Sequence, residues 1–167
     1  MIKLIFCSDL AGNIGKDNDL LFKYKEDMKF FRDTTLGSTM LMGYKTYESL
    51  GSQPLPKRLN LVLTRKKNVE LKDNMMIVDD LEKTINDFKQ NYPNDDLYII
   101  GGASVYNKSL ELGLVDEVLI TIVWKTIKDA DTKVELSLIF DNLPYKEKIK
   151  EFIAEDGNKA EIYRYYK

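Results

Sequence analysis

The sequence of 167 residues contains no histidine and a single cysteine, Cys7. The absence of histidine excludes Ser-His and Cys-His nucleophile pairs as well as metal sites with histidine ligands. One cysteine cannot form an internal disulfide or a CxxC zinc or redox motif, so we expect no metal site. If the chain is an enzyme, its acid–base chemistry falls to Asp, Glu, Lys or Tyr side chains, or to a bound cofactor.

The sequence also lacks an excess of charge of one sign and any long apolar run. Its 25 Lys and Arg residues are balanced by 27 Asp and Glu residues, so no basic field is present to attract nucleic acid. No stretch approaches the ~18 consecutive apolar residues of a membrane span, and the apolar start of the chain is too short for a signal-peptide core. We therefore expect a cytoplasmic protein without nucleic-acid or membrane partners.

The pattern of apolar residues predicts alternating strands and helices in one domain, residues 1–167. Strands are expected at 2–8, 40–42, 60–64, 75–78, 97–100 and 115–124, and helices at 24–35, 44–50, 80–90 and after 102. Residues 147–153 and 159–166 flank Asp156-Gly157-Asn158, which predicts a closing antiparallel hairpin. This order predicts an α/β fold with a mostly parallel central sheet, helices on both faces and an antiparallel C-terminal edge.

Glycines follow three of the predicted strands, close to the start of the next helix. They are Gly12 and Gly15, Gly43, and the pair Gly101-Gly102. Ligands of open α/β sheets bind beyond the carboxyl ends of strands, where helix N-termini offer N–H groups to phosphate. The pattern suggests a pyrophosphate held between two helices, although tight turns alone would also explain the glycines. It departs from GxGxxG and so does not indicate an ordinary Rossmann fold.

Asp27 shares a helix face with Tyr24 and Phe31. A carboxylate on an inner face loses hydration, and its pKa rises unless a partner or ligand compensates. The alternative is a carboxylate at the helix edge that faces solvent beside Glu26. Periodicity alone favours the solvated position slightly and does not decide between the two.

Two arginines, Arg58 and Arg65, bracket the predicted strand 60–64. A guanidinium can bind a carboxylate or phosphate through two parallel hydrogen bonds. Each arginine taken singly is more typical of a solvated surface charge.

Several ordered motifs together resemble the dihydrofolate reductase family. Met42–Gly51 is close to the family's MGRxTxESIG, Pro54–Asn60 to PLPGRxN, and Ile99–Tyr106 to the IGGxxxY element, while Gly12–Asn18 matches the mobile loop over the nicotinamide. The resemblance covers nearly the whole chain and is best at 1–64 and 97–121. It favours the inner position for Asp27.

The resemblance implies hydride transfer from NADPH to C6 of 7,8-dihydrofolate, with protonation of N5. The implied catalytic residues are Asp27, Thr121 and Phe22. Asp27 would accept hydrogen bonds from the pterin amino group and N3, and Thr121 would support the carboxylate. The implied substrate pocket comprises Ile5, Cys7, Met28, Phe31, Leu50, Leu55, Arg58, Ile100 and Tyr106. Arg58 would hold the glutamate α-carboxylate of the substrate, and Cys7 would act as a small packing residue rather than a nucleophile.

The resemblance also implies a set of NADPH-binding residues. They are Cys7, Ile14, Gly15, Asn18, Gly43, Tyr44, Lys45, Thr46, Leu63, Thr64, Arg65, Gly101, Gly102, Ala103, Ser104 and Val105. Arg65 would recognise the 2′-phosphate. Residues 38–94 would form an adenosine-binding subdomain and the remainder a major loop subdomain, in a chain that we expect to be monomeric.

The loop before Asp27 departs from the family's LPWxLPxD pattern. Leu21 and Lys25 replace the two prolines, which predicts a less stiff loop. Phe22 replaces a tryptophan and has no hydrogen-bond donor, so we expect altered turnover rather than loss of function. Tyr44 stands where the family commonly has arginine. After Trp124, Asp131-Thr132 is similar to the family's GDTxFP loop, but Lys133-Val134-Glu135 does not continue it.

Two other functions compete with folate reduction. A pyrimidine reductase of riboflavin synthesis has a similar fold and also uses NADPH, but Asp27 and Arg58 favour folate. A nucleotide-binding structural subunit without turnover would not require Asp27, Thr121 or the Gly-Gly pair.

Overall fold

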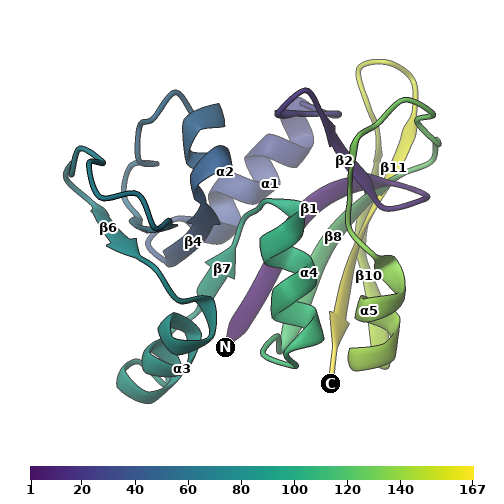
Figure 1. Cartoon of the computed structure of the whole chain (residues 1–167). Coiled ribbons are helices and arrows are strands. Elements are labelled where there is room, and N and C mark those ends of the chain that lie inside the picture. The colour runs from purple at the N-terminus through teal and green to yellow at the C-terminus, as the bar shows by residue number, and fades with distance from the viewer.

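The computed structural model describes all residues, Met1–Lys167, and centres on an eight-stranded sheet (Figure 1). The strands are β1 Ile2–Asp9, β2 Asn13–Lys16, β3 Asp19–Leu20, β4 Thr39–Gly43, β5 Leu59–Leu63, β6 Met75–Val78, β7 Leu97–Ile99, β8 Glu117–Val123, β9 Thr132–Lys133, β10 Tyr145–Ile153 and β11 Lys159–Tyr166. The helices are α1 Lys25–Thr35, α2 Tyr44–Ser49, α3 Leu81–Asn91, α4 Ala103–Glu111 and α5 Leu136–Asn142. None of these helices is long and apolar enough to cross a membrane.

The strand order of the main sheet is β10-β11-β8-β1-β7-β4-β5-β6. The pairs from β8 to β6 are parallel, whereas β11 is antiparallel to β8 and β10 is antiparallel to β11. Gly157 turns this final hairpin at φ +86°, a conformation that glycine adopts without a steric penalty. The predicted fold class, a mostly parallel sheet with an antiparallel C-terminal edge, is confirmed.

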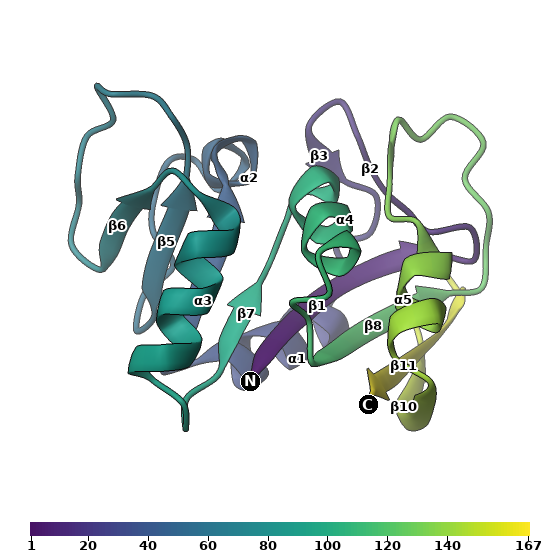
Figure 2. The same ribbon diagram turned by 60° about the horizontal axis from the view of Figure 1, so that its bottom comes forward.

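Helices cover both faces of the sheet (Figure 2). Successive strand residues point alternately into the two cores. Leu41 of β4 packs in the core beneath α3, α4 and α5, while its neighbours Met40 and Met42 pack in the core beneath α1 and α2. All three side chains are fully buried. These inner strands therefore read as continuous apolar runs, because a parallel sheet buries both faces.

Four elements were not predicted from the sequence: β2, β3, β9 and α5. The three strands form a small separate sheet in the order β3-β2-β9, which holds the loop after β1 against residues 132–133. The strands β3 and β9 have two residues each, too few for an alternating pattern to be recognised. The pairing of Gly15 with Thr132 joins segments far apart in the chain, so no local signal reports it.

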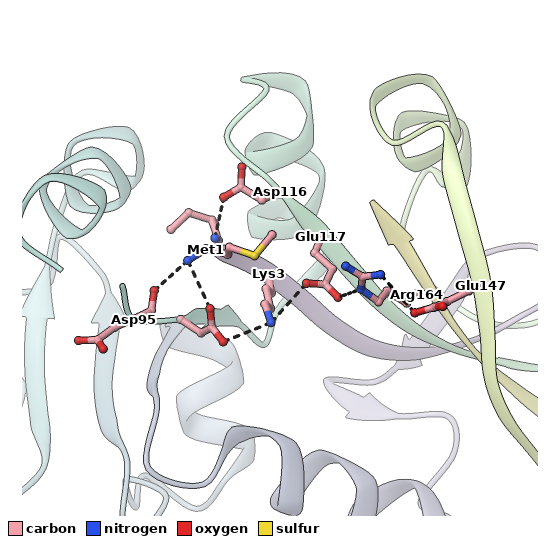
Figure 3. Close-up of polar contacts among 9 residues, drawn as sticks. Met1, Lys3, Asp95, Asp116, Glu117, Glu147 and Arg164 are labelled. Carbon is pink, nitrogen blue, oxygen red and sulfur yellow. Dashed lines mark hydrogen bonds and ion pairs between the residues drawn. The ribbon is translucent and has the colours of Figure 1, made fainter. Parts of the chain in front are cut away.

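At the end of the sheet where β1 begins, charged side chains link neighbouring strands (Figure 3). The Glu117 side chain, 5% exposed, pairs with Lys3 at 3.3 Å and with Arg164. Lys3 also pairs with Asp96 at 3.2 Å. Since Glu117 has two cationic partners and little contact with water, its charge is compensated within the protein. The cavity described below lies towards the opposite end of the sheet, where β1 ends.

Candidate active site

A cavity of about 380 Å³ lies between α1 and the carboxyl-terminal half of β1. The loop that follows β1 and the residues that follow β7 also line this cavity. It is lined by Ile5, Phe6, Cys7, Ile14, Gly15, Asn18, Asp19, Leu20, Phe22, Asp27, Met28, Phe31, Thr46, Ser49, Leu50, Leu55, Ile100, Gly101, Gly102, Tyr106 and Thr132. An apolar cavity with few polar groups is typical of a small-molecule site.

Asp27 lies in this cavity and is held by residues of two adjacent strands. Cys7 of β1 and Thr121 of β8 are register partners, so both side chains point to the same face of the sheet. The Thr121 hydroxyl donates a hydrogen bond of 2.5 Å to Oδ1 of Asp27. The helix α1 therefore directs this carboxyl group inward, and the solvated alternative does not describe its position.

Burial controls the protonation of both ionisable groups here. It raises the pKa of the Asp27 carboxyl, and hydrogen bonds from Thr121 and from the Cys7 thiol offset this only in part. Burial raises the pKa of the Cys7 thiol well above its usual range, and the charge of Asp27 raises it further. The thiol thus stays protonated, which fits a packing and hydrogen-bonding residue rather than a nucleophile.

Aromatic and aliphatic side chains surround the carboxyl group. Met28 and Phe31 follow Asp27 on α1, and Phe22 comes from the preceding loop with 8% of its surface exposed. The Tyr106 hydroxyl donates a hydrogen bond of 3.0 Å to the carbonyl oxygen of Ile5. This bond fixes the part of β1 that borders the cavity. The rest of the apolar wall includes Leu50, Leu55 and Ile100.

The predicted glycine motifs meet beside the cavity. The Gly43 N–H donates a hydrogen bond of 2.8 Å to the carbonyl oxygen of Gly101, and the Gly101–Gly102 peptide is cis. Gly101 has φ +136°, and an added Cβ would lie 3.0 Å from Oγ1 of Thr46. Gly102 precedes α4 without a side-chain cap, so the first N–H groups of this helix remain available for an anion.

A second cavity, of about 580 Å³, lies at the carboxyl ends of β5 and β6 next to α4. Its lining contains basic and acidic side chains together: Leu63, Thr64, Arg65, Asp79, Asp80, Leu81, Glu82, Ser104, Val105, Lys108 and Leu112. Five of the predicted cofactor-binding residues thus lie in this cavity, namely Leu63, Thr64, Arg65, Ser104 and Val105.

Several predicted residues line neither cavity: Gly43, Tyr44, Lys45, Arg58, Ala103 and Thr121. The Arg58 side chain is mostly buried, with Nε bonded to the Pro56 carbonyl oxygen at 2.9 Å and Nη1 to Oγ1 of Thr35 at 3.1 Å. The ammonium group of Lys66 lies 4.3 Å from the centre of the Tyr44 ring, and so places a cation beside this residue.

Sequence reasoning missed five residues that line the first cavity, Phe6, Asp19, Leu20, Ser49 and Thr132, and six that line the second, Asp79, Asp80, Leu81, Glu82, Lys108 and Leu112. It also missed Asp9, a fully buried carboxylate at the end of β1. Oδ1 of Asp9 accepts hydrogen bonds from the N–H groups of Ala11 and Asn13, both at 2.9 Å. Oδ2 accepts one from the Asn13 side chain at 2.8 Å and one from the Ile127 N–H at 2.7 Å. Asp9 therefore ties the loop over the cavity to a distant loop of the chain.

Comparisons with known proteins agree with this arrangement. The family model described as Dihydrofolate reductase matches residues 1–166. The dihydrofolate reductase of Ureaplasma parvum serovar 3 is 30% identical over 154 residues, which cover 92% of this chain and 94% of that protein. The enzyme of Haemophilus influenzae is 34% identical over 129 residues, covering 77% and 75% respectively.

A solved structure shares the fold. Dihydrofolate reductase from Enterococcus faecalis, complexed with NADP(H) and RAB-propyl, superposes with a TM-score of 0.79 at 24% identity. The match covers 99% of this chain and 95% of that one. This structure shows the shared fold, while the family model and the relatives above show that the chain belongs to the dihydrofolate reductase family.

Proposed function

We propose that this chain reduces 7,8-dihydrofolate to 5,6,7,8-tetrahydrofolate with NADPH as the reductant. Dihydrofolate reduction is the reaction of its family, which does not favour the pyrimidine reductase or the structural subunit. The observation that carries the proposal is the carboxyl group of Asp27, hydrogen-bonded to Thr121 inside an apolar cavity that extends to Gly101-Gly102. NADPH, when bound, supplies the hydride that reduces C6.

On the substrate side, Asp27 accepts hydrogen bonds from the amino group and N3 of the pterin. The walls formed by Met28, Phe31 and Leu50 exclude water from the flat ring and hold its polar edge towards the carboxylate. By stabilising the pterin tautomer that carries a basic N5, Asp27 promotes the protonation of that atom. Arg58 binds the glutamate α-carboxylate through Nη2, which makes no hydrogen bond within the chain.

The second cavity fits the adenosine half of the cofactor. Arg65 provides a guanidinium for the 2′-phosphate, and the uncapped N-terminus of α4 provides N–H groups for the pyrophosphate. Gly101 and Gly102 let the backbone approach the cofactor between the two cavities. In this proposal residues 38–94 form the adenosine-binding subdomain. The monomeric state and the cytoplasmic location stay predictions.

Absorbance at 340 nm tests the proposed function. A mixture of purified protein, NADPH and dihydrofolate is expected to lose absorbance at this wavelength, while omission of dihydrofolate leaves the signal constant. The omission excludes a simple oxidation of NADPH by oxygen. Constant absorbance at micromolar enzyme with both substrates present would reject the reductase and favour the structural subunit.

Replacing Arg65 with alanine is expected to raise the KM for NADPH by about tenfold to a hundredfold, because one charge-assisted hydrogen-bonding group is lost. The KM for NADH, which has no 2′-phosphate, should change little. Steady-state kinetics with each cofactor measures the two effects, and Lys67→Ala is the matched control because Lys67 lines neither cavity. Equal effects on both cofactors would place the 2′-phosphate elsewhere.

A further inference from the structure

The second cavity presents charges of both signs to a ligand. Arg65 and Lys108 contribute two positive charges, whereas Asp79, Asp80 and Glu82 contribute three negative charges. None of these five side chains forms an ion pair in the structure. The cavity is thus not a simple anion site, and its selectivity depends on how the two signs are arranged.

The register of the sheet brings the two signs together. β5 and β6 are parallel, with Leu63 opposite Val78, and the Thr64 N–H continues this ladder with a bond of 2.9 Å to the Val78 carbonyl oxygen. This register places Thr64 opposite Asp79, so Asp79 and Arg65 are diagonal neighbours where the two strands end. Both residues line the second cavity, so a ligand there that contacts the guanidinium also lies within reach of this carboxylate.

The acidic residues differ in their freedom to meet a ligand. Oδ1 of Asp80 accepts a hydrogen bond of 2.9 Å from the Lys83 N–H and caps α3. Asp79 is exposed, makes no side-chain hydrogen bond and precedes the cap by one residue. Glu82 is also exposed and free of hydrogen bonds, but it lies on the first turn of α3. Asp79 directly follows β6 and so lies beside the segment that carries Arg65, which makes it the free carboxylate best placed to turn towards a group bound there.

We propose that Asp79 determines the choice of cofactor by opposing Arg65. Its carboxylate repels the 2′-phosphate of NADPH and accepts a hydrogen bond from the free 2′-hydroxyl of NADH. An acidic residue on a ribose hydroxyl and an arginine on a 2′-phosphate are the two alternative solutions in dinucleotide sites, and this cavity contains both. The chain therefore uses NADH as well as NADPH, with a preference that Asp79 reduces. This inference rests on the proposed function, because it assumes that the cavity holds the adenosine ribose.

The test compares Asp79→Asn with the wild type for both cofactors. We expect the ratio of kcat/KM for NADPH to that for NADH to rise about tenfold, with the KM for dihydrofolate unchanged. High salt should shrink this difference, since it screens charges at an exposed cavity. The control Asp73→Asn removes an equal charge from an exposed loop residue that lines neither cavity, and should leave the ratio unchanged.

Two results would overturn the inference: an unchanged ratio in Asp79→Asn, or an equal rise in Asp73→Asn, which would indicate only the net charge of the chain. Dissociation constants of NADPH and NADH, measured by isothermal titration calorimetry, should give the same ratio without turnover. If wild type binds both cofactors but reduces no dihydrofolate, the proposed function fails while the calorimetric ratio still decides the role of Asp79. If it binds neither cofactor, both proposals fail.

Discussion

Replacing Asp27 with asparagine should slow dihydrofolate reduction by about two to four orders of magnitude at neutral pH, the range that a positioned acid–base group contributes. Asparagine keeps the shape of the side chain, and its Oδ1 can still accept the hydrogen bond of the Thr121 hydroxyl. The variant therefore loses the ionisable group without losing the geometry. The rate should recover in part in acid, where N5 of the substrate is protonated by solvent. Single-turnover measurements from acid to neutral pH follow both effects.

The stability of Asp27→Asn separates loss of chemistry from misfolding. Since burial raises the pKa of Asp27, the folded state binds this proton more tightly than the unfolded state does. The protonated Asp27 therefore contributes to the free energy of unfolding below the ordinary pKa of 3.8, and this contribution is lost as pH rises through the raised pKa. The variant lacks this loss and should melt at a higher temperature than wild type at pH 7. A near-wild-type rate across the pH range would remove Asp27 from its proposed role.

Replacing Asp9 with asparagine should lower the free energy of unfolding by about 2–3 kcal/mol, the penalty for a buried hydrogen-bonding mismatch. Each carboxylate oxygen of Asp9 accepts two hydrogen bonds, but asparagine would present an NH₂ group to one pair of these donors. The turnover number should fall as well, because Asp9 anchors the loop that carries Ile14 and Gly15 into the cavity. Urea denaturation and steady-state kinetics measure the two losses.

The pH dependence of stability gives Asp9→Asn a second signature. Burial acts to raise the pKa of Asp9, but its hydrogen bonds from Ile127, Asn13 and Ala11 outweigh burial and lower it below the ordinary value of 3.8. The resulting stability is present above that value and is lost as pH falls through the lowered pKa. The variant should lack this acid-dependent loss. The exposed Asp141→Asn is the control, and equal denaturation midpoints for the two variants would contradict the role of Asp9.

The strands of the main sheet and four of the five helices could be predicted from apolar runs, helical periodicity and capping residues in the sequence. The helix α3 begins after Asp80, as the capping residues indicated, and the segment Met75–Val78 is a strand with the predicted bounds. The small sheet of β2, β3 and β9 depends on contacts between distant segments, which neither propensity nor periodicity reports. The positions of Gly43 and Gly101-Gly102 beside the cavity could be predicted, because each stands at or just after the end of its strand in the sequence.

The orientation of Asp27 shows why periodicity could not define the site. One side of α1 faces a cavity, so its apolar stripe is incomplete: Met28 lines the cavity and is 50% exposed. Such a face has the same sequence pattern as the edge of a solvated helix. The partner Thr121 is fixed by the register of β1 and β8, and Asp9 stands at the end of an apolar run that reveals nothing of its four donors.

The outermost strand, β10, has one consequence for the behaviour of the protein in concentrated solution. Five of its nine residues are charged, Lys146, Glu147, Lys148, Lys150 and Glu151, and nearly the whole strand is exposed. A register shift at Lys148 and Lys150 also interrupts its pairing with β11. Any foreign strand that docked on this free border would have to strip water from these ions and match an irregular backbone. The charges and the irregular backbone of this edge strand therefore oppose the addition of further strands and the growth of fibrils.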